Sequence, residues 1–384
     1  LGKKLGCTRT IARIRNPEYM EQVDFIKEEL GIDLIINPDL ATAQAVEKYL
    51  LKSYSFYANE FASGMVQMLD FNIGHNEKFV GKSLMELKDF DDLLIVAISR
   101  DGDIIIPHGS TVLEDNDMIY VIGNNLDIDN FNLKHNFGKK KKEVENVMIL
   151  GGSNIGYYLA KRLSAAKISV RIIEQNKERA QELSDILDDV LVIHGDGTDI
   201  NLLEEANLVQ MDAFVGATGF DEQNLLMALM AKQAGVEDCI AKISRENYTK
   251  IIDRLDVDAA LNPVYITASN ILKYIRGGKV VSVSLLLGGD AEVTELIVGA
   301  DSPFLNKELQ SLHLPKGIII GAIVRKGQVI IPKGNSVVEA NDRIVVFSLT
   351  EDLPTLKLFF KPYKGGILGE LWHRTKGARH PFNN

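Results

Sequence analysis

Residues 146–159 read NVMILGGSNIGYYL, and this stretch decides the fold class. The apolar run Val147–Leu150 predicts a short buried strand, and the glycine-rich segment GGSNIG follows it directly. The next residues form one apolar helical face, at spacings i, i+3, i+4 and i+8: Ile155, Tyr158, Leu159 and Leu163. A strand, a glycine loop and an amphipathic helix in this order are typical of a dinucleotide-binding α/β lobe.

The glycine loop matches the fingerprint G-x-G-x-x-G with one departure. Gly151 permits the tight turn, and Gly156 lets the helix pack on the strand. The free backbone N–H groups and the helix dipole favour a phosphate here. Ser153 replaces the middle glycine, where the backbone normally approaches the pyrophosphate. We expect this serine to weaken or shift that contact, or to donate a hydroxyl hydrogen bond instead.

The region 144–278 alternates strand and helix patterns. Further apolar runs lie at Ser169–Glu174, Val190–His194, Ala213–Ala217 and Cys239–Ile243. They lack period-two alternation, which is typical of strands covered on both faces. The pattern predicts a doubly wound parallel sheet.

Charged and small residues end these strands at the edge where ligands bind. Glu174 follows Gly156 by 18 residues, so its carboxylate is placed to accept hydrogen bonds from adenosine ribose hydroxyls and to repel a 2′-phosphate. This favours NAD(H) or ATP/ADP over NADP. Arg179 lies five residues further along the chain. The alternative interpretation is that Glu174 is only a surface charge at the end of its strand.

Two short turns are expected at the same edge. Asp196, Gly197 and Thr198 follow the third strand, where a ligand would bind. A turn without any binding role would have the same sequence pattern. Ala217 and Thr218 end the fourth strand and could line the ribose.

Basic residues end the fifth strand. Lys242 and Arg245 are placed to neutralise phosphate charge across an open crevice, or simply to be solvated. Arg13 is the matching basic residue in a second copy of this region.

That second copy is visible as a long internal repeat. Residues 101–121 read DGDIIIPHGSTVLEDNDMIYV, and residues 326–346 read KGQVIIPKGNSVVEANDRIVV, with eleven of 21 positions identical. The repeat extends upstream, where Asn37-Pro38 recurs as Asn262-Pro263. A repeat of this length indicates a duplicated pair of domains.

The repeat predicts the domain organisation. We expect a remnant of a first Rossmann lobe, a first small lobe, a linker, a second Rossmann lobe, a second small lobe and a tail, at residues 1–55, 56–133, 134–145, 146–278, 279–360 and 361–384. Ile240 lies 94 residues after Asn146, whereas only ten residues precede its counterpart Ile11. The first copy is therefore expected to lack about 84 residues that would carry its own glycine loop.

Composition excludes several classes. The net charge of −10 and pI near 5.3 argue against a nucleic-acid surface. Two cysteines without a CxxC pair suit a reducing compartment. No apolar run reaches the length of about 18–20 residues that spans a bilayer. The chain shows no metal-ligand motif and no evident catalytic acid–base pair.

Taken together, the GGSNIG loop, the VRIIE strand end, the GDGT turn and the twin IIPxG hairpins resemble the RCK family, the regulators of potassium conductance. Two such modules in one chain resemble the TrkA family, the cytosolic regulatory subunits of Trk potassium uptake. The resemblance covers nearly all of residues 1–360. It implies tandem modules, each a Rossmann-like lobe followed by a small α+β lobe.

The resemblance also implies a function. Such chains form homo-oligomeric rings, here a tetramer of two-module chains, on the cytoplasmic face of the plasma membrane beneath a potassium-translocating subunit. Nucleotide occupancy changes the ring shape and biases the gate. Carried onto this sequence, the phosphate would be held by Gly151, Gly152, Ser153, Asn154 and Ile155. Glu174 would hold the ribose, and the turn from Asp196 to Thr198 would lie near the adenine.

Three alternatives stay open at this point. An NAD-dependent oxidoreductase would explain the loop and Glu174, but not the duplicated small lobe. A redox-sensing transcription regulator would need a helix-turn-helix and a basic face. A structural ring protein with vestigial nucleotide sites would explain Ser153.

Overall fold

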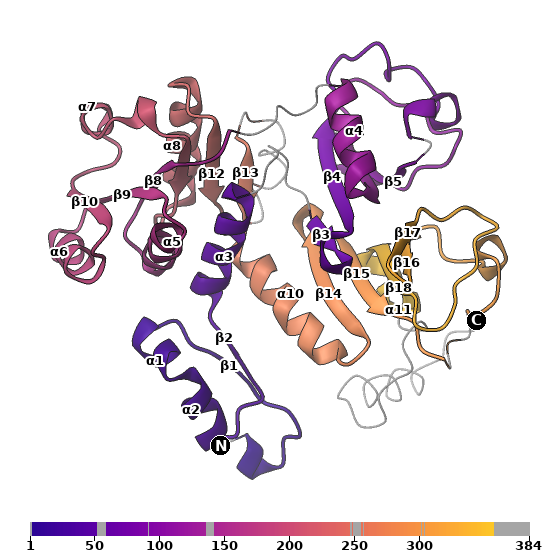
Figure 1. Cartoon of the computed structure of the whole chain (residues 1–384), viewed down its shortest axis with the longest axis horizontal. Coiled ribbons are helices and arrows are strands. Elements are labelled where there is room, and N and C mark those ends of the chain that lie inside the picture. The colour runs from indigo at the N-terminus through magenta and orange to yellow at the C-terminus, as the bar shows by residue number, and fades with distance from the viewer. Residues whose placement is uncertain are drawn as a thin grey trace, which may run out of the picture. The chain divides into compact units, whose positions relative to one another are not determined.

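The computed structural model describes residues 2–51, 59–90, 92–135, 142–245, 248, 255, 257–300, 302 and 304–356. The chain divides into two compact units. The first, here called the parallel unit, combines residues 1–57 with 132–270, and the second, the antiparallel unit, combines 58–131 with 271–384. Each unit is therefore built from segments of both sequence copies (Figure 1).

A six-stranded parallel sheet forms the centre of the parallel unit, in the order β10-β9-β8-β11-β12-β13. Its strands are β8 (Asn146–Leu150), β9 (Ser169–Glu174), β10 (Val190–His194), β11 (Ala213–Gly216), β12 (Asp238–Lys242) and β13 (Ala259–Leu261). The helices that alternate with them are α5 (Asn154–Ala165), α6 (Lys177–Ile186), α7 (Ile200–Glu205) and α8 (Asp221–Gln233). Val147 and Ile149 point into one apolar cluster, and Met148 and Leu150 into another. Burial on both faces explains the uninterrupted apolar runs.

The first fifty residues join this unit. Strands β1 (Ile11–Arg13) and β2 (Leu34–Ile36) pair in parallel, and helices α1 (Pro17–Glu21), α2 (Val23–Glu29) and α3 (Pro38–Leu50) accompany them. Helix α3 starts where the Asn37 side chain accepts hydrogen bonds from the N–H groups of Asp39 and Leu40. Pro38 suits the first helical position because its missing N–H needs no partner there.

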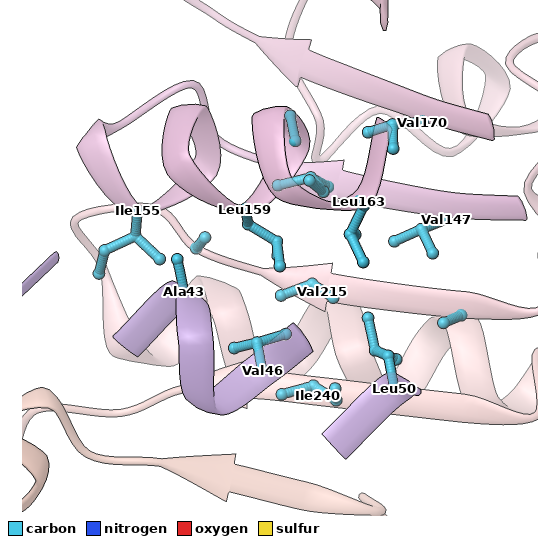
Figure 2. Close-up of a cluster of buried hydrophobic side chains, with 14 of the residues drawn as sticks. Ala43, Val46, Leu50, Val147, Ile155, Leu159, Leu163, Val170, Val215 and Ile240 are labelled. Carbon is cyan, nitrogen blue, oxygen red and sulfur yellow. The ribbon is translucent and has the colours of Figure 1, made fainter. Parts of the chain in front are cut away.

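Helix α3 packs against α5. Figure 2 shows Ala43, Val46 and Leu50 lying across from Ile155 and Leu159, and all five belong to one buried cluster. Polar contacts reinforce this apolar contact at both ends of the helix pair. The Asn37 amide donates to the Tyr158 hydroxyl at 3.0 Å, and Arg162 Nε lies 2.5 Å from Glu47 Oε2. The first copy thus covers one side of the Rossmann-like lobe of the second.

The antiparallel unit contains two five-stranded sheets with the same topology, β3-β4-β7-β5-β6 and β14-β15-β18-β16-β17. The first, here called lobe one, holds β3 (Asn59–Phe61), β4 (Val66–Asn72), β5 (Leu94–Arg100), β6 (Asp103–Ile105) and β7 (Met118–Asn124). The second, lobe two, holds β14 (Val280–Leu286), β15 (Ala291–Ile297), β16 (Ile318–Arg325), β17 (Gln328–Ile330) and β18 (Arg343–Leu349). Three more helices are α4 (Asn125–His135), α10 (Pro263–Arg276) and α11 (Leu353–Leu356).

An arginine clamp closes each lobe in the same way. Arg100 donates from Nε and Nη2 to the buried carboxylate of Asp117, and Arg325 does the same to Asp342, all at 2.7–2.9 Å. The hydrogen bonds to these aspartates raise the pKa of both arginines. The invariance of this aspartate between the two copies therefore has a structural cause.

The expected fold class is confirmed, and some local predictions need correction. The sequence pattern of Phe304–Leu312 predicts a short helix, but only the 3-10 turn Leu309–Leu312 forms there, because Leu305 and Glu308 make β-bridges instead. The sequence pattern of Leu353–Phe360 predicts a closing helix; the structure has a helix at Leu353–Leu356, and residues 357–360 lie outside the described part of the chain. Lys139–Lys141 of the expected linker and the tail from 361 lie outside the described residues. A run of lysines such as Lys139–Lys142 is typical of a solvated linker, but Lys142 donates to Asp212 Oδ1 at 2.9 Å.

Candidate functional site

The glycine loop lies between β8 and α5 at the carboxyl edge of the parallel sheet. Gly151 has φ of 104°, in the region that favours glycine, and a Cβ there would lie 3.0 Å from the backbone nitrogen of Thr218. A Cβ on Gly156 would lie 2.1 Å from the carbonyl oxygen of Gly151. Both obstacles are backbone atoms, so this loop can form only with glycine at these two positions.

The start of α5 is suited to an anion. Asn154 and Ile155 occupy the first turn, where backbone N–H groups have no partner within the helix. These dipoles sum with the rest of the helix to a partial positive charge. The loop therefore presents donors where the sequence analysis expects phosphate.

Ser153 stands at the N-cap of α5. Its hydroxyl donates to the carbonyl oxygen of Ala217 at 2.9 Å and accepts from the Gly156 N–H at 3.5 Å. The hydroxyl therefore ties the glycine loop to the end of β11. The sequence led us to expect that the Ser153 hydroxyl donates a hydrogen bond at the site. In the structure it donates to the Ala217 carbonyl oxygen of the protein itself.

Ser153→Ala is predicted to lower the free energy of unfolding by about 1–2 kcal/mol while leaving nucleotide affinity nearly unchanged. The cap and the bond to Ala217 are lost, but the backbone donors of the loop remain. Chemical denaturation and calorimetric titration measure the two quantities, with Ser164→Ala on the same helix as the control. A large loss of affinity without loss of stability would show that the hydroxyl binds the ligand directly.

Glu174 lies against the loop from the end of β9. Its carboxylate accepts from the Gly152 N–H at 2.6 Å and from the Asn176 N–H at 2.7 Å. Arg179 donates from Nε to the carbonyl oxygen of Gly152 at 2.8 Å and pairs with Glu182. The ends of β8 and β9 are thus joined through Gly152, and the remaining lone pairs of Glu174 can accept from hydroxyl groups.

The turn after β10 is held by internal hydrogen bonds, with Asp196 and Thr198 exposed. Asp196 accepts from the N–H of Thr198 at 2.9 Å and from its hydroxyl at 2.8 Å, and these bonds lower the pKa of Asp196. A Cβ on Gly197 would lie 1.9 Å from Leu150 Cδ1, so glycine lets this turn approach the end of β8.

Asn224 holds the end of β11 in place. This fully buried side chain accepts from the Thr218 N–H and hydroxyl, both at 2.8 Å, and donates to the carbonyl oxygen of Lys242 at 3.0 Å. Asn224 is not among the site residues predicted from the sequence. A signal was present, because Asn224 shares a helical face with the apolar residues Met227, Ala228 and Ala231.

The basic residues Lys242, which ends β12, and Arg245, which follows it, both have acidic partners at this edge. Lys242 donates to the carbonyl oxygen of Thr218 at 2.9 Å and lies 3.6 Å from the buried Asp221. Arg245 pairs with Glu222 at 2.6 Å. The positive charges of Lys242 and Arg245 are therefore balanced by carboxylates of the protein. The sequence-based expectation of an open crevice did not include these acidic partners.

Residues of the first copy border the loop. The Asn154 amide donates to the carbonyl oxygen of Arg15 at 3.2 Å and to Asp39 Oδ2 at 3.3 Å. The Arg15 guanidinium binds the same carboxylate at 2.9 and 3.0 Å, and this bond raises the pKa of Arg15. Arg13, the basic residue of the first copy that the sequence indicated, lies exposed in β1, whereas Arg15 and Asp39 were not predicted.

Two domain-family models match this chain. The TrkA-N domain model matches residues 147–263, and the TrkA-C domain model matches residues 68–133 and 293–361. Trk system potassium uptake protein TrkA homolog 1 of Methanosarcina mazei is 35% identical over 355 residues, which cover 92% of this chain and 79% of the relative. The chain belongs to the TrkA family.

A second relative comes from Haemophilus influenzae. Trk system potassium uptake protein TrkA of Haemophilus influenzae is 32% identical, with 92% of this chain and 78% of the relative covered. A solved structure of the GsuK channel is 17% identical with a TM-score of 0.49, and covers 93% of this chain and 63% of that one. The two domain-model matches and the relative from Methanosarcina mazei confirm the family predicted from the sequence motifs.

No helix of the described ranges is both long and apolar enough for a membrane span. Over the same ranges, no group of three or more histidine, cysteine, aspartate or glutamate side chains is arranged to hold a metal.

Proposed function

We propose that this chain is a regulatory subunit of a Trk-type potassium uptake system that senses a nucleotide in its parallel unit. The observation that carries the proposal is the glycine loop. Its two obligatory glycines and the open first turn of α5 form a cradle for phosphate, in a chain of the TrkA family.

The ligand is NAD(H) or an adenine nucleotide. The loop residues Gly151, Gly152, Ser153, Asn154, Ile155 and Gly156 surround the phosphates through their backbone. Glu174 lies 2.6 Å from the Gly152 nitrogen, so it stands beside the cradle, where a ribose would follow the phosphates. Its negative charge disfavours the 2′-phosphate of NADP. Asp196, Gly197 and Thr198 border the adenine end.

The remaining site residues act at the other end. Ala217 and Thr218 shape the wall that Asn224 holds, and Arg179 fixes Gly152. Lys242 and Arg245 supply positive charge, which the carboxylates of Asp221 and Glu222 partly neutralise. These residues orient and hold a ligand, and we assign none of them a catalytic step.

Regulation follows from the contact between the loop and the first copy. Asn154 belongs to the loop and also binds Asp39 and the Arg15 backbone. A phosphate at the loop therefore changes the surroundings of a side chain that holds α3. A ligand that favours one arrangement by about 1–3 kcal/mol shifts its population roughly 5–150-fold. We propose that ring-forming copies transmit this shift to a membrane potassium-translocating subunit at the inner face of the plasma membrane.

Titration of the purified chain with NADH, NADPH, ATP and ADP tests the binding step. We expect binding of NADH or ATP, and a loss of about 10–100-fold in Glu174→Ala, because hydrogen bonds to a charged group contribute about 1.5–3 kcal/mol. Glu182→Ala is the matched control, since Glu182 also lies beside Arg179 but is bonded away from the loop. No binding of any of the four nucleotides would favour a structural ring protein with vestigial sites.

Potassium uptake tests the second step. Cells that contain a Trk-type translocating subunit, but lack its regulatory chain, are complemented with this chain or with Glu174→Ala. If the unaltered chain and Glu174→Ala restored uptake to the same level, nucleotide binding would not control uptake. That result would contradict the sensing role.

A further inference from the structure

The loop after β11 carries an exposed phenyl ring at the ligand-binding edge of the parallel sheet. Phe220 is the N-cap residue of α8, and 70% of its surface is exposed to solvent. The Phe220 side chain makes no cap hydrogen bond, so the start of α8 does not depend on the ring. Burial of apolar surface is favourable, so a ring left in water beside a binding site stabilises any ligand that covers it.

The backbone fixes this ring beside the glycine loop. The Phe220 N–H donates to the Thr218 hydroxyl oxygen at 3.2 Å, and the Phe220 carbonyl oxygen accepts from the Asn224 N–H at 3.0 Å. Thr218 in turn abuts Gly151, since a Cβ on that glycine would lie 3.0 Å from the Thr218 nitrogen. One residue separates Thr218 from Phe220, so the ring starts from a held backbone next to the phosphate cradle.

The order of the strands indicates which part of a ligand reaches this ring. The chain runs outward from β8 to β9 and β10 and then returns to β11 on the other side of β8, so the winding reverses between β8 and β11. A dinucleotide lies across the crevice at such a reversal. Glu174, proposed to hold the adenosine ribose, ends β9 on one side of the glycine loop. Phe220 follows β11 on the other side, where a second nucleoside would follow the pyrophosphate.

The charged groups next to Phe220 do not favour a third phosphate. Asp221 and Glu222 come directly after the ring in the chain. The Asp221 carboxylate lies 3.6 Å from Lys242 Nζ, and the Glu222 carboxylate lies 2.6 Å from Arg245 Nη1. The four charges of this group sum to zero. A γ-phosphate extending past β11 would therefore gain no net positive charge from them, whereas a nicotinamide ring needs none.

We infer that Phe220 stacks on the second base of a bound dinucleotide and so makes the site selective for NAD(H) over ATP and ADP. This role of Phe220 rests on the proposed nucleotide site and specifies its ligand. A flat ring contacts the face of a nicotinamide through apolar burial and dispersion. ATP and ADP have no second base to place there. Phe220 is thus a specificity-determining residue of the site.

Calorimetric titration of the full chain with NADH, ADP-ribose, ATP and ADP tests this role. ADP-ribose keeps the adenosine, the two phosphates and the second ribose of NADH, but lacks its second base. We expect the unaltered chain to bind NADH more tightly than the other three. Phe220→Ala is expected to weaken NADH binding about 5–150-fold, the range that corresponds to about 1–3 kcal/mol of base–aromatic stacking. Its affinity for ADP-ribose and ADP is expected to stay unchanged.

Two further variants serve as controls. Phe220→Tyr keeps a flat ring and is expected to retain the NADH affinity of the unaltered chain. Phe25→Ala removes a ring that is 64% exposed on α2, a helix that supplies no residue of the site. It is expected to change none of the four affinities, which separates the role of Phe220 from a general effect of losing an exposed ring.

The outcomes separate this role from the nucleotide site itself. Equal losses of NADH and ADP-ribose affinity in Phe220→Ala would show that the ring supports a part common to both ligands. Unchanged NADH affinity would show that the ring contacts no ligand. Either result, or tighter binding of ATP than of NADH by the unaltered chain, would overturn the inference while the nucleotide site stands. If none of the four ligands bound, the inference and the proposed function would both be wrong.

Discussion

Gly156→Ala is expected to abolish nucleotide binding and to lower the free energy of unfolding by about 3 kcal/mol, at the upper end of overpacking costs. The added Cβ would lie 2.1 Å from the carbonyl oxygen of Gly151. The obstacle is backbone, so the loop itself must move. A displaced loop loses the geometry in which the N–H groups at the start of α5 face a phosphate.

Gly219→Ala is the matched control for this loop variant. Gly219 lies in the neighbouring loop after β11, has no positive φ, and a Cβ there would meet no atom within 4 Å. Calorimetric titration and urea unfolding are carried out on both variants. Binding by Gly156→Ala at the affinity of the unaltered chain would refute the placement of the ligand in the glycine loop.

Arg276→Met is expected to cost about 3–5 kcal/mol of unfolding free energy, because it leaves a buried carboxylate without its partner. Arg276 at the end of α10 binds Glu292 of β15 with both terminal nitrogens, one of them at 2.8 Å. The Glu292 side chain is fully buried. Urea unfolding followed by circular dichroism measures the loss.

The first copy suggests the rescue of that variant. Its residues at the positions of Arg276 and Glu292 are Leu51 and Gln67, an uncharged pair. Arg276→Met combined with Glu292→Gln should therefore recover most of the stability, since no charge remains buried. If the double variant were as unstable as the single one, packing of the arginine stem rather than charge would explain the loss.

Local features of the site were predictable from the sequence. The loop, the strand ends and the repeat are each defined by residues close together in the chain, and the parallel strands place their carboxyl ends at one edge. The strand Ser169–Glu174 and the positions of Gly151, Gly156 and Glu174 follow from this logic.

Contacts between distant segments were not predictable in this way. Arg15 and Asp39 border the loop only because α3 packs on α5, and no local pattern specifies that pairing. The partners Asp221 and Glu222 of the basic residues stand about twenty residues earlier in the chain. The segment before Leu309 has a helical pattern, but Leu305 forms a β-bridge to Val338 instead. Here tertiary pairing overrides the local helix propensity.

The packing of α3 on α5 sets an order of events during synthesis. Glu47 and its partner Arg162 are 115 residues apart, and the Tyr49 hydroxyl contacts the Asp258 carbonyl oxygen across 209 residues. At about 5–20 residues per second, α3 leaves the ribosome roughly 6–23 s before the helix that covers it. During that interval Val46 and Leu50 remain exposed. The nascent chain therefore passes through a stage that a chaperone can recognise, and the parallel unit cannot complete its core until its last strand has been made.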